Sequence, residues 1–180
     1  METYVEPCID EIKVNDIDLF AQSVTGKRVY DSGDHATERV EVFLMCWLNG
    51  LDYPNKHQHM MALYERLRAD FPANGKLFRV MSFGNESHCP STIKPLELAS
   101  YTDDMEIAQD ILDKQEGWTR YVYETDAIKA FDLHKMLMRI QELTQSWDME
   151  TVIIDREWEQ EKLYPFVPTN NQLIWTDKEN

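Results

Sequence analysis

The chain has 180 residues, of which 43% are hydrophobic, so it can fold as one ordinary domain or as a compact core with a helical extension. Its 33 Asp and Glu residues against 18 Lys and Arg give a formal net charge of -15, which disfavours direct binding to nucleic acid or to anionic membranes. The 3 cysteines have no CxxC spacing and no stretch approaches the roughly 20 apolar residues that span a bilayer, which argues against a disulfide scaffold, a zinc ribbon and a membrane protein.

Helical periodicity governs the first part of the chain. Residues 36–50 place apolar side chains at helical spacing and end at Gly50, a residue typical of helix C-termini. A second apolar stripe covers residues 56–70 and stops at the turn-rich residues 72–75. We therefore expect residues 1–75 to form a helical N-terminal extension that packs on the rest of the protein.

Strand and helix patterns alternate after this extension. Runs of β-prone residues predict strands at 77–83, 96–102 and 119–124. Periodic segments predict helices over 103–114 and from Asp132 onwards, and Asp103 and Glu106 have the spacing of a capping box.

The tail adds three more predicted strands, at 151–155, 158–166 and 172–176. Strands and helices are thus interspersed over residues 76–180. This arrangement is typical of an α+β fold, with residues 76–180 as its core.

An acidic run interrupts the predicted strand 158–166. In an extended strand Glu157, Glu159 and Glu161 project from one face, although Glu is depleted in strands. One interpretation is an exposed edge strand that charges protect from aggregation. The other is catalytic, because paired carboxylates can stabilise an oxocarbenium-like centre while one of them takes a proton. The bond between ribose and nicotinamide in NAD is a glycosidic bond of the kind that such a pair cleaves.

Two hydroxyl groups and one cation are further candidates for chemistry. Ser100 and Thr102 have the spacing that places both side chains on one face of a strand, and they directly precede a predicted helix. Their hydroxyls can therefore have either of two roles, to bind a ligand or to cap that helix. Arg79 is a cation within an apolar strand. Its guanidinium can pair with a structural carboxylate or bind a ligand phosphate with two hydrogen bonds.

Taken in chain order, these groups resemble the motifs of the R-S-E class of ADP-ribosyltransferases. The matching segments are Leu77-Phe78-Arg79, Ser100-Tyr101-Thr102 and Glu159-Gln160-Glu161. The likeness is nearest to the small mono-ADP-ribosyltransferases of tailed bacteriophages, which modify host RNA polymerase and other host proteins. It covers residues 76–180 and implies an ADP-ribosyltransferase-like split β-sandwich core for them. Val80 and Lys162 stand where that family often has Gly and an apolar residue.

The resemblance implies that NAD is a substrate and that two glutamates are catalytic. Glu161 would stabilise the positive charge that develops on the ribose as nicotinamide leaves. Glu159 would accept a proton from an attacking guanidinium, because E-x-E in this class accompanies arginine as acceptor. A second register, Glu157-Trp158-Glu159, also fits the motif, but the apolar residues that follow Glu161 favour the first.

The same resemblance assigns the other motif residues to NAD binding. Arg79 would hold an NAD phosphate, and Ser100 would bind the ribose or orient the catalytic glutamate. Either Tyr101 or Phe83 is expected to stack on nicotinamide, with packing in the core as the alternative for Phe83. Thr102 completes the element that binds the dinucleotide.

The implied function is transfer of ADP-ribose from NAD to an exposed arginine of a protein, such as host RNA polymerase or another host protein, in the host cytoplasm. The acidic surface favours such an Arg-rich partner. Two other functions fit the sequence: an acidic inhibitor or nucleic-acid mimic that sequesters a basic partner, and an NAD glycohydrolase.

No metal cofactor and no membrane contact are expected. His57 and His59 lie two positions apart in a predicted helix, a spacing that does not place both rings on one face. His88-Cys89 has no matching second pair of ligands.

Overall fold

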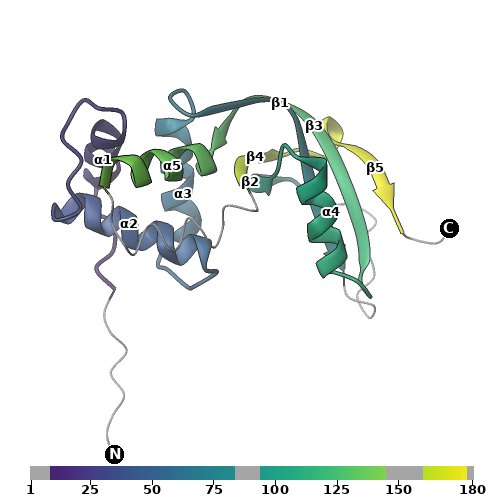
Figure 1. The fold of residues 1–180 in the computed structure, drawn as a ribbon. Helices are drawn as coiled ribbons and strands as arrows, with labels where there is room; N and C mark the ends of the chain where they lie inside the picture. The colour runs from purple at the N-terminus through teal and green to yellow at the C-terminus, as the bar shows by residue number, and fades with distance from the viewer. Residues whose placement is uncertain (1–8, 84–93, 145–159, 178–180) are drawn as a thin grey trace, which may run out of the picture. The chain divides into compact units, whose positions relative to one another are not determined.

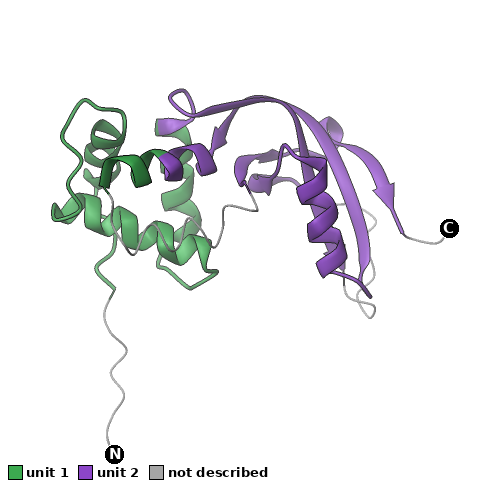
Figure 2. Ribbon diagram, viewed as in Figure 1, with its two compact units in different colours: residues 1–66, 139–153 green, residues 67–138, 154–180 purple. Residues whose placement is uncertain are grey.

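A computed structural model describes residues 9–83, 94–144 and 160–177 (Figure 1). The chain divides into two compact units, as Figure 2 shows. Unit 1 contains residues 1–66 and 139–153, and unit 2 contains residues 67–138 and 154–180. Each unit therefore combines segments that are distant in the sequence.

Unit 1 is built from helices. Its elements are α1 (Asp16–Val24), α2 (His35–Leu48), nearly all of α3 (Lys56–Leu67) and the second half of α5 (Leu133–Thr144). The first three bury apolar side chains from one stripe each, namely Phe20, Val24, Val40, Phe43, Leu44, Met60 and Leu63. The predicted helices over 36–50 and 56–70 are confirmed as α2 and α3, whereas α1 was not predicted.

Unit 2 contains a five-stranded antiparallel sheet. Its strands are β1 (Pro72–Phe83), β2 (Leu96–Tyr101), β3 (Thr119–Asp132), β4 (Lys162–Phe166) and β5 (Gln172–Thr176). The order is β1-β3-β4-β2, and β5 pairs with the first part of β3. Helix α4 (Met105–Lys114), a 3-10 turn (Pro168–Asn170) and the start of α5 complete the unit. The expected α+β class is confirmed.

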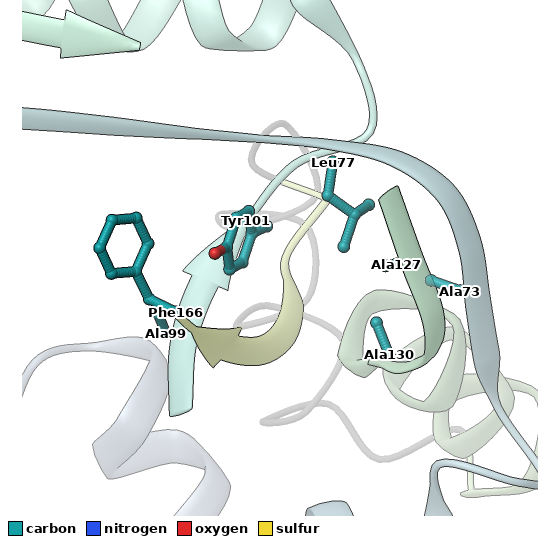
Figure 3. Packing of buried hydrophobic residues seen from close by; sticks show 7 residues of the cluster. All are labelled: Ala73, Leu77, Ala99, Tyr101, Ala127, Ala130 and Phe166. Carbon is teal, nitrogen blue, oxygen red and sulfur yellow. The ribbon is translucent and has the colours of Figure 1, made fainter. Parts of the chain in front are cut away.

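Apolar side chains cover both faces of the sheet, because neighbouring residues of a strand point to opposite faces. One cluster holds Leu77 and side chains from three other strands; its buried members are Ala73, Leu77, Ala99, Tyr101, Ala127, Ala130 and Phe166 (Figure 3). The second cluster joins the next residue of β1, Phe78, to Ala108 and Leu112 of α4 and to Val122 of β3. Helix α4 therefore packs on the face opposite to the first cluster.

The turn expected at residues 72–75 is wrong: these residues belong to β1. The register with β3 shifts between Ala73 and Gly75, and Gly75 has φ 99°. The Asn74 side chain accepts a hydrogen bond from Lys129 N at 2.9 Å. The Asn and Gly that suggested a turn therefore lie within β1, where Asn74 is opposite a β-bulge formed by Ile128 and Lys129 of β3.

The capping residue of α4 is also corrected. Asp104, and not Asp103, is the N-cap, and its carboxylate accepts a hydrogen bond from Glu106 N at 2.8 Å. Thr102 Oγ1 accepts one from Asp104 N at 3.3 Å, which turns the chain for one more residue before the helix begins.

Candidate functional site

A pocket of about 380 Å³ lies in unit 2 where β1 approaches β2. The two strands are joined by an isolated bridge, in which Phe78 N donates to Thr102 O at 2.7 Å and Thr102 N donates to Phe78 O at 2.9 Å. Elsewhere β1 pairs with β3, and β2 pairs with β4. The pocket is lined by Phe78, Arg79, Val80, Ser100, Tyr101, Thr102, Ile111, Lys114, Gln115 and Glu161. All three motif segments of the sequence thus contribute to one pocket.

Ser100 and Glu161 meet at this pocket although 61 positions separate them in the chain. Ser100 Oγ donates a hydrogen bond to Glu161 Oε1 at 2.5 Å. The pairing of β2 with β4 places them side by side, since Ser100 is the register partner of Leu163 and Tyr101 that of Lys162. The backbone of Glu161 is also held, because its carbonyl accepts a hydrogen bond from His134 N at 3.1 Å. Hydrogen bonds therefore hold both the carboxylate and the main chain of Glu161.

Arg79 contributes a cation to the same pocket. Its Nη1 donates to the carbonyl of Ser100 at 3.0 Å, and its guanidinium carbon lies 5.9 Å from the centre of the Phe166 ring. Its Nε is buried and has no hydrogen-bond partner, and Arg79 forms no ion pair within the described part of the chain. Burial lowers the pKa of Arg79, an effect that the nearby Tyr101 hydroxyl opposes. An anion bound in the pocket would relieve the cost of burying this charge.

The structure places the other two residues of the hydroxyl motif in different surroundings. Tyr101 is 3% exposed, and its ring packs in the core cluster (Figure 3). Its hydroxyl donates to Asn171 Oδ1 at 3.1 Å. Burial raises the pKa of Tyr101 to about 12. Thr102 is equally buried and uses its hydroxyl in the turn before α4, but it does not cap the helix, whose N-cap is Asp104. Both residues line the pocket, but each side chain also has a structural role.

The backbone at Gln160 is not extended, contrary to the predicted strand over residues 158–166. Gln160 has φ 45°, and β4 begins only at Lys162. The regular alternation expected for the acidic run therefore fails at Gln160. Glu157 and Glu159 lie outside the described residues.

Lys162 is a buried cation next to Glu161, and its role was not foreseen from the sequence. It is 3% exposed, and its Nζ donates to Gln160 O at 2.9 Å. The same nitrogen lies 3.5 Å from Asp132 Oδ1 and 3.7 Å from Asp103 Oδ1. Lys162 thus links the backbone at Gln160 to the starts of two helical segments.

The end of α4 supplies three pocket residues that the sequence analysis did not single out: Ile111, Lys114 and Gln115. Gln115 is the C-cap of the helix, and its Oε1 is buried without a hydrogen-bond partner among the described residues. The sequence could not identify these three residues as pocket residues, because their contact with β1 and β2 depends on the tertiary fold.

Within the described ranges, no group of three or more His, Cys, Asp or Glu side chains is arranged to hold a metal ion. No helix in the same ranges is long and apolar enough to cross a membrane. The pocket offers a cation, a hydroxyl and a carboxylate, a combination suited to an anionic ligand that also carries sugar hydroxyls.

Comparisons with protein-family models, with curated proteins and with solved structures found no match to this chain.

Proposed function

We propose that this protein is an NAD-dependent mono-ADP-ribosyltransferase that transfers ADP-ribose to arginine side chains of a target protein and releases nicotinamide. One observation carries the proposal: Ser100 Oγ is hydrogen-bonded to Glu161 at 2.5 Å, and Arg79 binds the carbonyl of the same serine at 3.0 Å. The three side chains come from distant parts of the chain and line one pocket. The proposal includes an ADP-ribosyltransferase-like fold for unit 2.

Each of these groups has a defined task in the proposed reaction. The Arg79 guanidinium binds a phosphate of NAD, which neutralises a buried cation that has no ion-pair partner among the described residues. The Glu161 carboxylate stabilises the positive charge that grows on the ribose as the bond to nicotinamide breaks. Ser100 holds that carboxylate in one orientation, so little reorganisation is needed in the transition state.

The arginine acceptor is the more specific part of the proposal. A guanidinium nitrogen attacks the ribose carbon, and a base must take its proton; Glu159, two residues before Glu161, is the proposed base. The net charge of -15 supports a basic target, because opposite charges accelerate the encounter and favour binding.

The test is a mass-spectrometric search for ADP-ribose on proteins of a cell extract after incubation with the protein and NAD. We expect modified arginines with the wild type, and none with Glu161→Gln. Free ADP-ribose without modified protein would instead identify an NAD glycohydrolase. If neither product forms, while a basic protein is captured equally by wild type and Glu161→Gln and released at high salt, the protein is an acidic binding protein and the proposal is wrong.

A further inference from the structure

The pocket contains two buried polar groups whose hydrogen bonds are incomplete. Arg79 Nε and Gln115 Oε1 both have no partner among the residues that the structure describes. A buried polar atom without a hydrogen bond destabilises the folded state, and such atoms are rare in proteins. Both residues line the same pocket, so one ligand can reach both. Arg79 requires an acceptor, whereas Gln115 presents an acceptor for a donor.

The main chain holds Gln115 in place at the end of α4. Gln115 N donates to Leu112 O at 3.0 Å, and Gln115 O accepts from Trp118 N at 3.2 Å. On the inner side of the helix, Leu112 is 3% exposed and packs with Phe78 of β1. Only the side-chain torsions of Gln115 remain to adjust, and rotation of its terminal amide presents either the oxygen or the nitrogen to a ligand.

We propose that Gln115 is a specificity-determining residue that binds an amide-like edge of NAD, that is, a group with an N–H donor beside an acceptor. This inference rests on the proposed function, since it takes NAD as the ligand. An amide side chain pairs best with such an edge, because its own donor and acceptor are then both satisfied. NAD has two edges of this type: the carboxamide of nicotinamide and the amino-pyrimidine edge of adenine.

Calorimetric titration of the whole protein tests the inference with NAD and two analogues. One analogue carries a carboxylate in place of the nicotinamide carboxamide, and the other carries purine without the 6-amino group in place of adenine. We expect Gln115→Met and Gln115→Ala to bind NAD roughly five- to tenfold more weakly than wild type, the effect of one lost hydrogen bond. The matched control is Gln109→Met on the same helix, whose side chain pairs with Asp113 at the surface and does not line the pocket.

The analogues identify which edge is bound. If Gln115 binds the carboxamide, wild type discriminates against the carboxylate analogue and both Gln115 variants lose that discrimination. If it binds adenine, wild type discriminates against the purine analogue, which lacks the donor, and both Gln115 variants lose that discrimination. Unchanged NAD affinity in both folded Gln115 variants overturns the inference. Binding does not require transfer, so NAD binding that depends on Gln115 without any transfer would refute the proposed transferase alone. Absence of NAD binding by wild type would refute both.

Discussion

Ser100 contributes two groups to the pocket, its hydroxyl to Glu161 and its carbonyl to Arg79. Replacement by alanine removes the first contact and keeps the second, because the carbonyl belongs to the main chain. We predict that Ser100→Ala lowers kcat by roughly 10- to 100-fold, since a catalytic group that is no longer oriented loses much of its effect. KM for NAD should change little. Initial rates of nicotinamide release at several NAD concentrations separate the two parameters.

Ser82→Ala is a suitable control for this change. Ser82 lies on β1 three residues beyond Arg79 and does not line the pocket. It should retain the wild-type kcat. A Ser100→Ala protein with unchanged kcat would show that the hydrogen bond to Glu161 has no catalytic role.

Arg79 allows a test of charge against geometry. Arg79→Lys keeps the positive charge but loses the two-pronged guanidinium, whereas Arg79→Met also loses the charge. We predict that Arg79→Met weakens NAD binding roughly 10- to 100-fold, the effect of losing a charge-assisted hydrogen bond, and that Arg79→Lys lies in between. Calorimetric titration with NAD measures both.

Arg139→Met serves as the control for Arg79, because Arg139 lies in unit 1 and pairs with Glu142 at the surface. Equal affinities for Arg79→Met and this control would rule out phosphate binding by Arg79.

For individual residues, the sequence was enough to group Arg79, Ser100 and Glu161, which line one pocket, but not to find the residues around them. Order along the chain was enough to group Arg79, Ser100 and Glu161, because the motif resemblance already relates residues from distant strands. Gln115 and Lys162 could not be found in this way. Their significance depends on burial and on contacts across the sheet, which local pattern does not contain.

Among the individual strands, β4 depends most on a single side chain, because Lys162 holds the start of this strand in place. Its ammonium group contacts Gln160 O and two carboxylates while it is 3% exposed. We predict that Lys162→Met lowers the free energy of unfolding by roughly 1–3 kcal/mol, since it leaves the partly buried Asp132 and the Gln160 carbonyl without this donor. Urea denaturation measures the change.

The exposed Lys135 on α5 provides the comparison, and Lys135→Met should unfold at nearly the wild-type urea concentration. If Lys162→Met is as stable as this control, the contacts of Lys162 do not hold the segment before β4.

Pairing between strands that are distant in the sequence explains why one predicted strand is shorter than the observed β3. The strand expected at 119–124 continues to Asp132 as β3, through residues such as Asp126 and Lys129 that have low strand propensity. Pairing with β1 overrides that propensity, and the bulge of β3 opposite Asn74 includes Lys129, which has φ 53°. Helix α1 was missed for a different reason: it has only 9 residues and no side-chain cap at its N-terminus.

At the scale of the whole molecule, tertiary packing in unit 1 buries a carboxylic acid, Glu41, away from solvent. Glu41 is 6% exposed, and the hydroxyl of Ser32 lies 3.4 Å from its carboxylate. Burial raises the pKa of Glu41, the hydrogen bond from Ser32 opposes this, and the nearby Glu38 adds to it. The folded state therefore binds a proton at Glu41 more tightly than the unfolded state does. The free energy of unfolding accordingly falls as the pH rises above the ordinary pKa of a glutamate.

We accordingly predict that Glu41→Gln has a higher Tm than wild type at pH 7. The difference should shrink as the pH falls below about 4.5, the ordinary value for a glutamate, because the wild-type carboxyl is then protonated in both states. Thermal denaturation of both proteins over a pH series measures this. A difference that is independent of pH would contradict the account of Glu41.

The division into units depends on contacts that periodicity does not report. A change from helical to strand-like pattern near residue 75 is visible in the sequence. Membership of residues 139–144, the second half of α5, in unit 1 depends instead on tertiary contacts. The α+β class was predictable because it depends only on which elements occur, whereas the grouping of distant segments is set by the tertiary structure.

The most direct test of the central claim is the rate of nicotinamide release from NAD by wild type, Glu161→Gln and the matched variant Glu116→Gln. Glu116 is exposed in unit 2 and does not line the pocket. The rate should be read in the presence of an arginine-rich acceptor, with circular dichroism to verify that all three proteins are folded. We predict that Glu116→Gln matches wild type, while Glu161→Gln is slower by roughly 100-fold or more, the effect of removing a transition-state charge contact. Equal rates for Glu161→Gln and wild type, or no release by any of the three, would contradict the assignment of this pocket as the site of NAD cleavage.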